Sequence, residues 1–192
     1  PFCATQLGEF AADVIKIELP GVGDATRRFG TMHECGDTLP WLSESRNKKC
    51  ITLDLRKPDG VELLKRLVAQ ADVLVENYRP GVMARLGYGW EMLHALYPRL
   101  VYAAVSGFGQ TGPDAGKPAY DMVVQARGGV MSITGETGGP PVRVGASIGD
   151  IVAGMYLAQG VLAALYQREK TGAGAFIDVA MLDSQLAIPE HA

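Results

Sequence analysis

A carboxylate that follows a glycine-rich stretch is the residue of this sequence best suited to chemistry. Asp150 comes directly after Gly149, where a long helical pattern over residues 148–168 begins. Unpaired N–H groups and the helix dipole stabilise a carboxylate at a helix start, so an ordinary N-cap is one interpretation. The other is a nucleophilic carboxylate in a glycine-lined pocket, which a bulky thioester can approach closely and where amides can hold an oxyanion.

The segment 77–81 is a second candidate, because it follows a predicted strand and leads toward Arg85. It contains Asn77, Tyr78 and Arg79. An aromatic ring can stack on a nucleotide base and arginines can pair with phosphate, so the segment is suited to holding a nucleotide. The alternative interpretation is a turn whose charges are solvated.

Basic residues gather in the segment 45–49, which ends at Lys49, and Arg56 ends the strand predicted after it. A run of this size commonly forms a solvated edge of the molecule. The alternative is that these side chains supply positive charge to a phosphorylated cofactor. The sequence leaves both interpretations open.

Several familiar sites are excluded by spacing. Residues 107–113 match the GxGxxG spacing of a dinucleotide-binding loop, but Pro113 ends the match where a helix would have to open. None of the three histidines, His33, His94 and His191, has a metal-ligand neighbour at useful spacing, so no metal site is predicted.

Composition limits the class of protein further. The 192 residues are 47% hydrophobic and 20% charged, as in an ordinary globular protein, and one domain over residues 1–192 is predicted. The net charge of -3 argues against a nucleic-acid partner. Three cysteines without paired spacing favour a reducing, cytoplasmic compartment. We recognise no stretch of about 20 apolar residues and therefore expect no membrane span.

Short β-type runs alternate with helical patterns and must position these candidates. Strands are predicted at residues 14–18, 51–55, 73–75, 100–105 and 176–179, and helices at 90–97, 120–127, 148–168 and from Pro58 onward. This alternation predicts an α/β fold with Rossmann-like βαβ units and a mostly parallel sheet that is buried on both faces. Ligands of such sheets bind beyond the carboxyl ends of the strands, where the loops 18–24, 77–81 and 106–117 fall.

Taken together, these segments resemble the class III CoA-transferase family, also called the formyl-CoA transferase or carnitine-CoA-transferase family. Order and spacing match through nearly the whole chain. The matching segments are residues 12–18, 47–49, 53–54, 71–81, 98–101, 107–113, 120–121, 149–150 and 170–172 with Gly174.

The resemblance implies site residues. Asp150, preceded by Gly149, corresponds to the catalytic aspartate, and Tyr120 and Asp121 fall near the active site. The residues predicted to contact CoA are Lys49, Arg56, Asn77, Tyr78, Arg79, Arg85, Leu86 and Lys117. Leu19 stands where some members carry a CoA-binding arginine, and Pro118, next to Lys117, stands where some carry a lysine.

The resemblance also implies an enzyme that transfers CoA between an acyl-CoA and a free carboxylic acid. The aspartate attacks the donor thioester to form a mixed anhydride. The released CoA thiolate converts the anhydride to an aspartyl-CoA thioester, and an acceptor carboxylate reverses the sequence. Coenzyme A is the only cofactor and no metal is needed. The segments 109–113 and 170–172 also occur in members that use dicarboxylates, so a dicarboxylate is the expected donor or acceptor.

Two alternatives stay open. The first is a 2-methylacyl-CoA racemase of the same family, in which a His-Asp pair occupies the positions of Tyr120 and Asp121 and acts with the aspartate at Asp150. Tyr120 disfavours it, because a phenol with a pKa of about 10 is a poor base at neutral pH. The second is a truncated, non-catalytic CoA-binding module.

Family members are about twice this length, since the typical chain carries a second, small domain. The resemblance therefore implies that residues 1–192 are a partial CoA-binding large domain, with the family's first strand expected before Pro1 and the small domain after Ala192. Family dimers are interlocked, with active sites shared between subunits. A homodimer is therefore expected, and the chain alone is expected to be weakly active or inactive.

Overall fold

A computed structural model describes residues 1–189 and divides the chain into two compact units, Pro1–Gln70 and Ala71–Ala192. Residues 190–192 lie outside the described part, and the expectation for His191 falls there. Both units combine helices with parallel strands, which confirms the predicted α/β class. The single domain over residues 1–192 stays a prediction.

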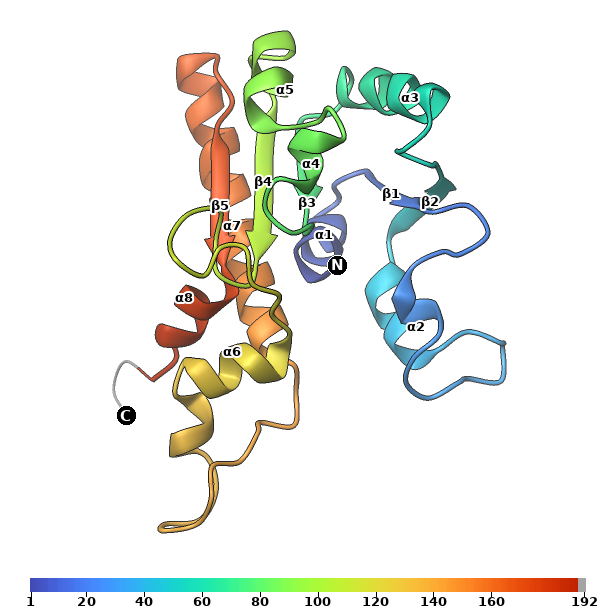
Figure 1. Ribbon diagram of the computed structural model, residues 1–192. Coiled ribbons are helices and arrows are strands. Elements are labelled where there is room, and N and C mark those ends of the chain that lie inside the picture. Colours follow the sequence, from blue (N-terminus) through green and yellow to red (C-terminus); the bar gives the residue numbers. More distant parts are fainter. Residues whose placement is uncertain (190–192) are drawn as a thin grey trace. The chain divides into compact units, whose positions relative to one another are not determined.

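The first unit contains a two-stranded parallel sheet, in which β1 pairs with β2 from Val14↔Lys48 to Glu18↔Thr52. Its elements are α1 Phe2–Glu9, β1 Val14–Glu18, the 3₁₀ helix η1 Ala25–Arg27, α2 Leu39–Ser45, β2 Lys48–Thr52 and α3 Pro58–Val68 (Figure 1). β2 thus begins and ends three residues before the predicted strand 51–55. The strand ends early because the Asp54 carboxylate accepts the N–H of Arg56 and turns the chain toward α3.

α3 confirms the helix predicted from Pro58 onward. Proline stands in its first turn, where the missing N–H has no helical partner, and Asp59 adds a favourable charge there. Lys65 and Arg66 lie in the last turn. Gly60 lets the helix approach the preceding turn, since a Cβ at this position would lie 2.0 Å from the Asp54 carbonyl oxygen.

The second unit contains a three-stranded parallel sheet in the order β3-β4-β5. Its elements are β3 Val73–Glu76, α4 Val82–Arg85, α5 Trp90–Leu96, β4 Val101–Ser106, α6 Asp121–Arg127, the 3₁₀ helix η2 Val130–Ile133, α7 Ile148–Thr171, β5 Phe176–Ala180 and α8 Met181–Leu186. β3, β4 and β5 confirm three predicted strands within one or two residues. The expectation of burial on both faces holds only for the central strand β4, because β3 and β5 keep exposed positions in the described part.

α7 is the longest helix, with 24 residues, and it contacts β4, β5, α6 and α8 (Figure 1). It ends as predicted at Gly172, whose φ of 74° is the left-handed conformation that glycine adopts readily. Contrary to the sequence expectation, α7 is long and apolar enough to cross a membrane by length and composition. Core helices pass the same test, and α7 contacts the strands β4 and β5. The absence of a membrane span stays a prediction.

Candidate functional site

Asp150 is exposed and lies in the first turn of α7. The interpretation of Asp150 as an ordinary N-cap is wrong, because Ser147 is the N-cap and makes no side-chain capping hydrogen bond. A carboxylate in the first helical turn is stabilised by the positive end of the helix dipole. The fold therefore places the Asp150 carboxyl group at the N-terminal end of the longest helix.

Asp121, which lies in the neighbouring helix α6, caps the N-terminal end of α7. It is buried in the first turn of α6, and its Oδ1 accepts the backbone N–H of Gly149 at 2.8 Å. Its Oδ2 accepts from Arg143 Nη2 at 2.8 Å and Nε at 3.1 Å. Gln125 Nε2 donates to both oxygens, at 3.0 and 2.9 Å. The structure thus brings Asp121 and Gly149 into contact, and Asp150 directly follows Gly149.

Gly149 is required by the close approach of α6. A Cβ at position 149 would lie 2.6 Å from Val124 Cγ2 and 3.1 Å from Asp121 Oδ1. Val124 itself is buried in an apolar cluster with Ala153 and Met181. The Gly149 N–H donates its hydrogen bond to Asp121. It therefore cannot also donate to an oxyanion at this end of the helix.

Gln125 and Arg143 are two residues of this site that the sequence reasoning missed. Gln125 is fully buried, and its Oε1 accepts the N–H of Val144 at 2.9 Å while Nε2 donates to the carbonyl of Ala146 at 3.2 Å. The available signal was the spacing of Gln125 four residues after Asp121, which places both on one face of α6. Nothing local in the sequence pairs Arg143 with a helix 22 residues earlier.

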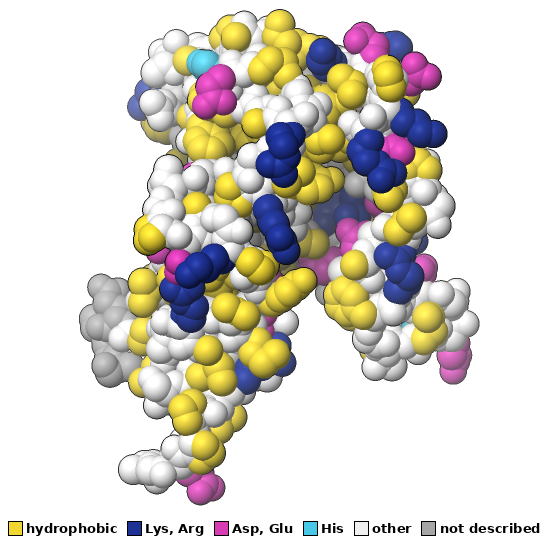
Figure 2. All heavy atoms as spheres, in the orientation of Figure 1, with side chains coloured by type: hydrophobic (Ala, Val, Ile, Leu, Met, Phe, Trp, Pro, Cys, Tyr) yellow, Lys and Arg dark blue, Asp and Glu magenta, His cyan; other side chains and the backbone are white. Residues whose placement is uncertain are grey.

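Tyr120, the N-cap of α6, makes no side-chain capping hydrogen bond and is 76% exposed. Further exposed apolar side chains lie on α6, η2 and the irregular segment after η2, namely Met122, Val123, Ile133 and Val142. Figure 2 shows hydrophobic side chains on the surface of this unit.

The loop after β3 and the short helix α4 that follows it carry most of the predicted CoA contacts. Asn77, Tyr78 and Arg79 lie in the loop, Arg85 in α4, and Leu86 is the C-cap of α4. Tyr78 is partly exposed, and its backbone N–H donates to Glu76 Oε2 at 2.7 Å. Gly81 adopts a φ of 81° at the N-terminus of α4, and a Cβ there would lie 3.3 Å from Arg85 Nη1. Arg85 is therefore folded back over the loop that contains Tyr78 and Arg79.

Glu76 is buried at the carboxyl end of β3 beneath this loop. Desolvation, and to a lesser extent the negative charge of Asp178, raise the pKa of Glu76 to about 7. Glu76 and Arg79 line a cavity of about 280 Å³ together with aromatic side chains, among them Trp90 and Tyr102. The carboxyl edge of this sheet thus holds a recess with both charged and apolar walls.

The glycine loop 107–113 also lies at this edge. The Gln110 N–H donates to Asp178 Oδ2 at 2.8 Å, and the Leu182 N–H donates to the Gly107 carbonyl at 3.1 Å. Both bonds fix the loop to β5 and α8. No helix follows the loop directly, which agrees with the rejection of a dinucleotide fingerprint.

Three of the predicted cofactor-binding cations are paired with acids in the structure. Arg56 binds Asp54 through two hydrogen bonds, of 2.8 and 3.0 Å. Lys49 Nζ lies 2.8 Å from Asp13 Oδ2. Lys117 Nζ lies 2.6 Å from Asp114 Oδ1. All three cations are largely exposed, so a phosphate could compete for them, since exposed ion pairs contribute little stability.

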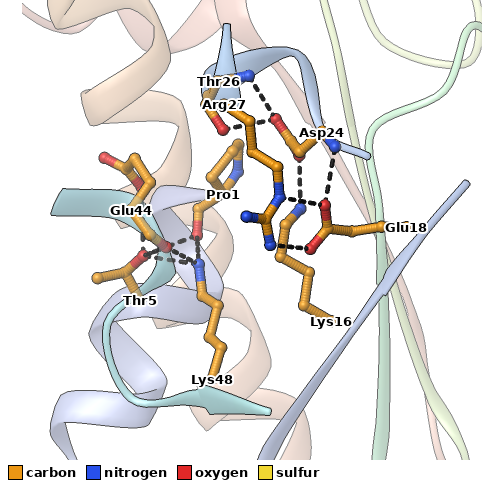
Figure 3. Close-up of polar contacts among 9 residues, drawn as sticks. All are labelled: Pro1, Thr5, Lys16, Glu18, Asp24, Thr26, Arg27, Glu44 and Lys48. Atoms are coloured by element: carbon orange, nitrogen blue, oxygen red, sulfur yellow. Dashed lines mark hydrogen bonds and ion pairs between the residues drawn. The ribbon is translucent and has the colours of Figure 1, made fainter. Parts of the chain in front are cut away.

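A polar cluster in the first unit was not predicted from the sequence. Glu18, buried at the end of β1, accepts from Arg27 Nε and Nη2 at 2.8 and 3.0 Å and from the Asp24 N–H at 2.8 Å (Figure 3). Lys16 pairs with Asp24 at 2.5 Å, and the Arg27 guanidinium lies 3.5 Å from the centre of the Trp41 ring. The hydrogen bond from Arg27 lowers the pKa of Glu18 to about 2. These contacts fix the loop 18–24, one of the predicted ligand loops.

The acidic side chains of the candidate site are the carboxyl groups of Asp121 and Asp150. Within residues 1–189, no three His, Cys, Asp or Glu side chains gather closely enough to hold a metal ion. The fold and the site together define an α/β protein with parallel strands. An exposed acid lies in the first turn of α7, and Asp121 of α6 caps this end of α7.

The chain belongs to CoA-transferase family III, whose family model matches residues 1–191. It is 49% identical over 185 residues to the succinyl-CoA–L-malate CoA-transferase beta subunit of Chloroflexus aurantiacus, covering 96% of this chain and 46% of that protein. It is 48% identical over 194 residues to the acetyl-CoA:oxalate CoA-transferase of Acetobacter aceti, covering 100% and 49%. The chain spans about half the length of the curated relatives it matches.

The structure is similar to the crystal structure of a CAIB/BAIF family protein from Brucella suis. The TM-score is 0.93 at 38% sequence identity, and the match covers 99% of this chain and 51% of the other. This likeness confirms the α/β large-domain fold that the resemblance implied.

Proposed function

We propose that this chain carries the CoA-binding and nucleophile-bearing part of an enzyme that transfers CoA between an acyl-CoA and a free carboxylic acid. The observation that carries the proposal is the pairing of two acids with opposite surroundings. Asp150 is exposed in the first turn of α7, whereas Asp121 is buried and accepts hydrogen bonds from Gly149, Gln125 and Arg143. Asp150 is the acid suited to attack, and Asp121 the acid suited to holding it in place.

In the proposed reaction, an Asp150 oxygen attacks the thioester carbon of the donor, and the C–S bond breaks to release CoA thiolate. The thiolate then attacks the Asp150 carbonyl of the mixed anhydride, forms an aspartyl-CoA thioester and releases the donor acid. An acceptor carboxylate runs the two steps in reverse. Covalent catalysis of this kind divides one difficult exchange into easier steps.

The CoA moiety is proposed to lie at the carboxyl edge of β3, as ligands of parallel sheets generally do. Tyr78 offers an exposed ring for stacking on the base, and the proposed phosphate partners are Arg79 in the same loop and Arg85 in α4, which follows the loop. In this unit, Lys117 would have to exchange Asp114 for phosphate. Contacts from Lys49 and Arg56 to CoA stay predictions of the resemblance.

The hydrogen bonds of Asp121 disfavour the racemase alternative. A racemase needs two acid/base groups on opposite faces of the α-carbon. Asp121 already accepts five hydrogen bonds from Gly149, Gln125 and Arg143, so taking a substrate proton would disrupt the cap of α7.

A dicarboxylate donor or acceptor is part of the proposal, since one relative is named for succinyl-CoA and malate and another for oxalate. A homodimer is proposed as well, supported by the exposed apolar side chains over α6 and η2. A cytoplasmic location remains a proposal that rests on cysteine usage.

The test uses the protein expressed from its complete gene. Purified protein is mixed with succinyl-CoA and a panel of free acids, including malate, oxalate and glutarate, in buffer made with D₂O. A separate reaction in the same buffer contains a 2-methylacyl-CoA. Formation of a new acyl-CoA without deuterium at its α-carbon supports the transferase. Deuterium wash-in at the α-carbon of a 2-methylacyl-CoA, without CoA exchange, would establish the racemase instead. Saturable CoA binding without either reaction would indicate a binding module.

A further inference from the structure

We propose that Gln125 and Arg143 are positioning residues that set the orientation of Asp150 by holding the segment 143–149 against α6. The inference rests on the proposed function, because it concerns how the nucleophile is aimed. Neither residue is required to touch the substrate.

The segment that leads into Asp150 has little regular structure of its own. Residues 141–147 belong to no helix or strand, and Arg143, Gly145, Ala146 and Ser147 are exposed. One local backbone bond joins the Ile148 N–H to the Ala146 carbonyl at 2.9 Å. An exposed segment of this kind samples many conformations unless other elements hold it.

α6 holds the segment at four points through Asp121 and Gln125. Asp121 binds the Arg143 side chain and the Gly149 N–H. Gln125 binds the Val144 N–H and the Ala146 carbonyl. Because the two residues are four apart on one helix, they lie side by side and address successive parts of the segment.

The amide of Gln125 suits this task in a way that other side chains cannot reproduce. Its oxygen accepts from Val144, and its nitrogen donates both to Asp121 and to Ala146. The side chain is fully buried, so each bond would be costly to lose. A carboxylate of the same shape would keep the acceptor but lose the donor, and would place a second anion against Asp121.

Arg143 completes the arrangement from the segment itself. Two of its guanidinium nitrogens, Nε and Nη2, grip one oxygen of Asp121, and Nη2 lies 3.5 Å from Ser147 Oγ. The cation balances the charge of Asp121 beside the Gly149 amide. Gly149 directly precedes Asp150, so a displacement of this amide moves the nucleophile. Displacing a reacting group by about 1 Å costs on the order of 100-fold in rate.

The test compares Gln125→Glu and Arg143→Ala with the wild type, all expressed from the complete gene, and uses Gln70→Glu as the matched control. Gln70 is an exposed residue just after α3, and its side chain bonds only a local carbonyl in the described part. CoA transfer gives kcat and KM, and hydrogen exchange reports on the Val144 and Gly149 amides. Thermal unfolding monitors the fold.

We expect Gln125→Glu to lower kcat by roughly 10- to 100-fold, with the KM for acyl-CoA changed less than about twofold. Arg143→Ala should lower kcat in the same way, Arg143→Lys should restore part of it, and Gln70→Glu should match the wild type. The Gly149 amide should exchange faster in Gln125→Glu, because the second carboxylate repels Asp121, which accepts this amide.

Unchanged kcat in folded Gln125→Glu and Arg143→Ala would overturn the inference, as would an equal loss in Gln70→Glu. If Gln125→Glu fails to fold, Arg143→Ala decides, because its side chain lies at the surface. A wild-type protein that transfers no CoA would instead overturn the proposed function. This result can be told apart from failure of the inference, which requires an active wild type whose variants keep its kcat.

Discussion

Alanine at position 149 tests the close approach of α6 to the start of α7. The added methyl group would lie 2.6 Å from Val124 Cγ2, whereas carbon atoms in contact are normally about 3.5–4.0 Å apart. The two helices must therefore separate by about 1 Å, or Val124 must leave its position in the core. The separation also stretches the 2.8 Å hydrogen bond from the Gly149 N–H to Asp121.

Overpacking of this kind costs about 1–3 kcal/mol, and a weakened buried hydrogen bond adds about 1 kcal/mol. The better helix propensity of alanine returns less than about 1 kcal/mol. We therefore expect Gly149→Ala to lower the free energy of unfolding by about 2 kcal/mol, which corresponds to a fall in Tm of roughly 4–8 °C for a chain of this size.

The assay is thermal and urea unfolding followed by circular dichroism, with Gly145→Ala as the matched control. Gly145 lies four residues earlier, and a Cβ there would meet no atom within 4 Å. The control should unfold within about 0.5 kcal/mol of the wild type. Equal stability of Gly149→Ala and the wild type would refute the reasoning, and so would equal destabilisation of the two variants.

Three further predictions concern charged groups. Arg168→Met should lower the free energy of unfolding by about 2–3 kcal/mol in urea titrations, because the buried guanidinium bonds Asp72 at 2.7 Å and two backbone carbonyls; no change would contradict this. The hydrogen bond from Arg27 lowers the pKa of Glu18, so the stability that Glu18 contributes above about pH 4.5 should be lost as the pH falls toward 2. Glu18→Gln should unfold with less dependence on pH in this range than the wild type. Glu76 has a raised pKa, so the free energy of unfolding of the wild type should fall as the pH rises from about 4.5 to 7. Glu76→Gln should remove this fall and be the more stable protein at pH 8. The same pH dependence of unfolding in both proteins would refute the prediction.

The sequence predicted the parts of the fold that depend on local patterns. The apolar run of β4 and the proline and charges of α3 are such patterns, and both elements were confirmed. The predicted strand 51–55 was displaced because hydrophobicity alone does not register the turn that Asp54 makes with Arg56. Exposure of β3 and β5 was not foreseen, because burial depends on which elements cover a strand.

The candidate site was predicted as a set of residues but not as an arrangement. The resemblance singled out Asp121, Gly149 and Asp150, and their roles stay a prediction. The contacts around them join residues that are 21 to 28 positions apart, as in the bonds from Gln125 to Ala146 and from Gly149 to Asp121. No periodicity encodes such pairings. For the same reason the bond between Glu18 and Arg27 was missed.

The most direct test of the account asks whether Asp150 becomes covalently bound. The protein expressed from its complete gene is incubated with succinyl-CoA, quenched in acid, digested and examined by mass spectrometry, beside the Asp150→Asn variant. We predict that CoA or the acyl group is found on the peptide containing Asp150, that the variant carries neither, and that its transfer rate falls at least about 1,000-fold, since covalent catalysis is lost. An adduct on another residue, or undiminished transfer by a folded Asp150→Asn protein, would contradict the account.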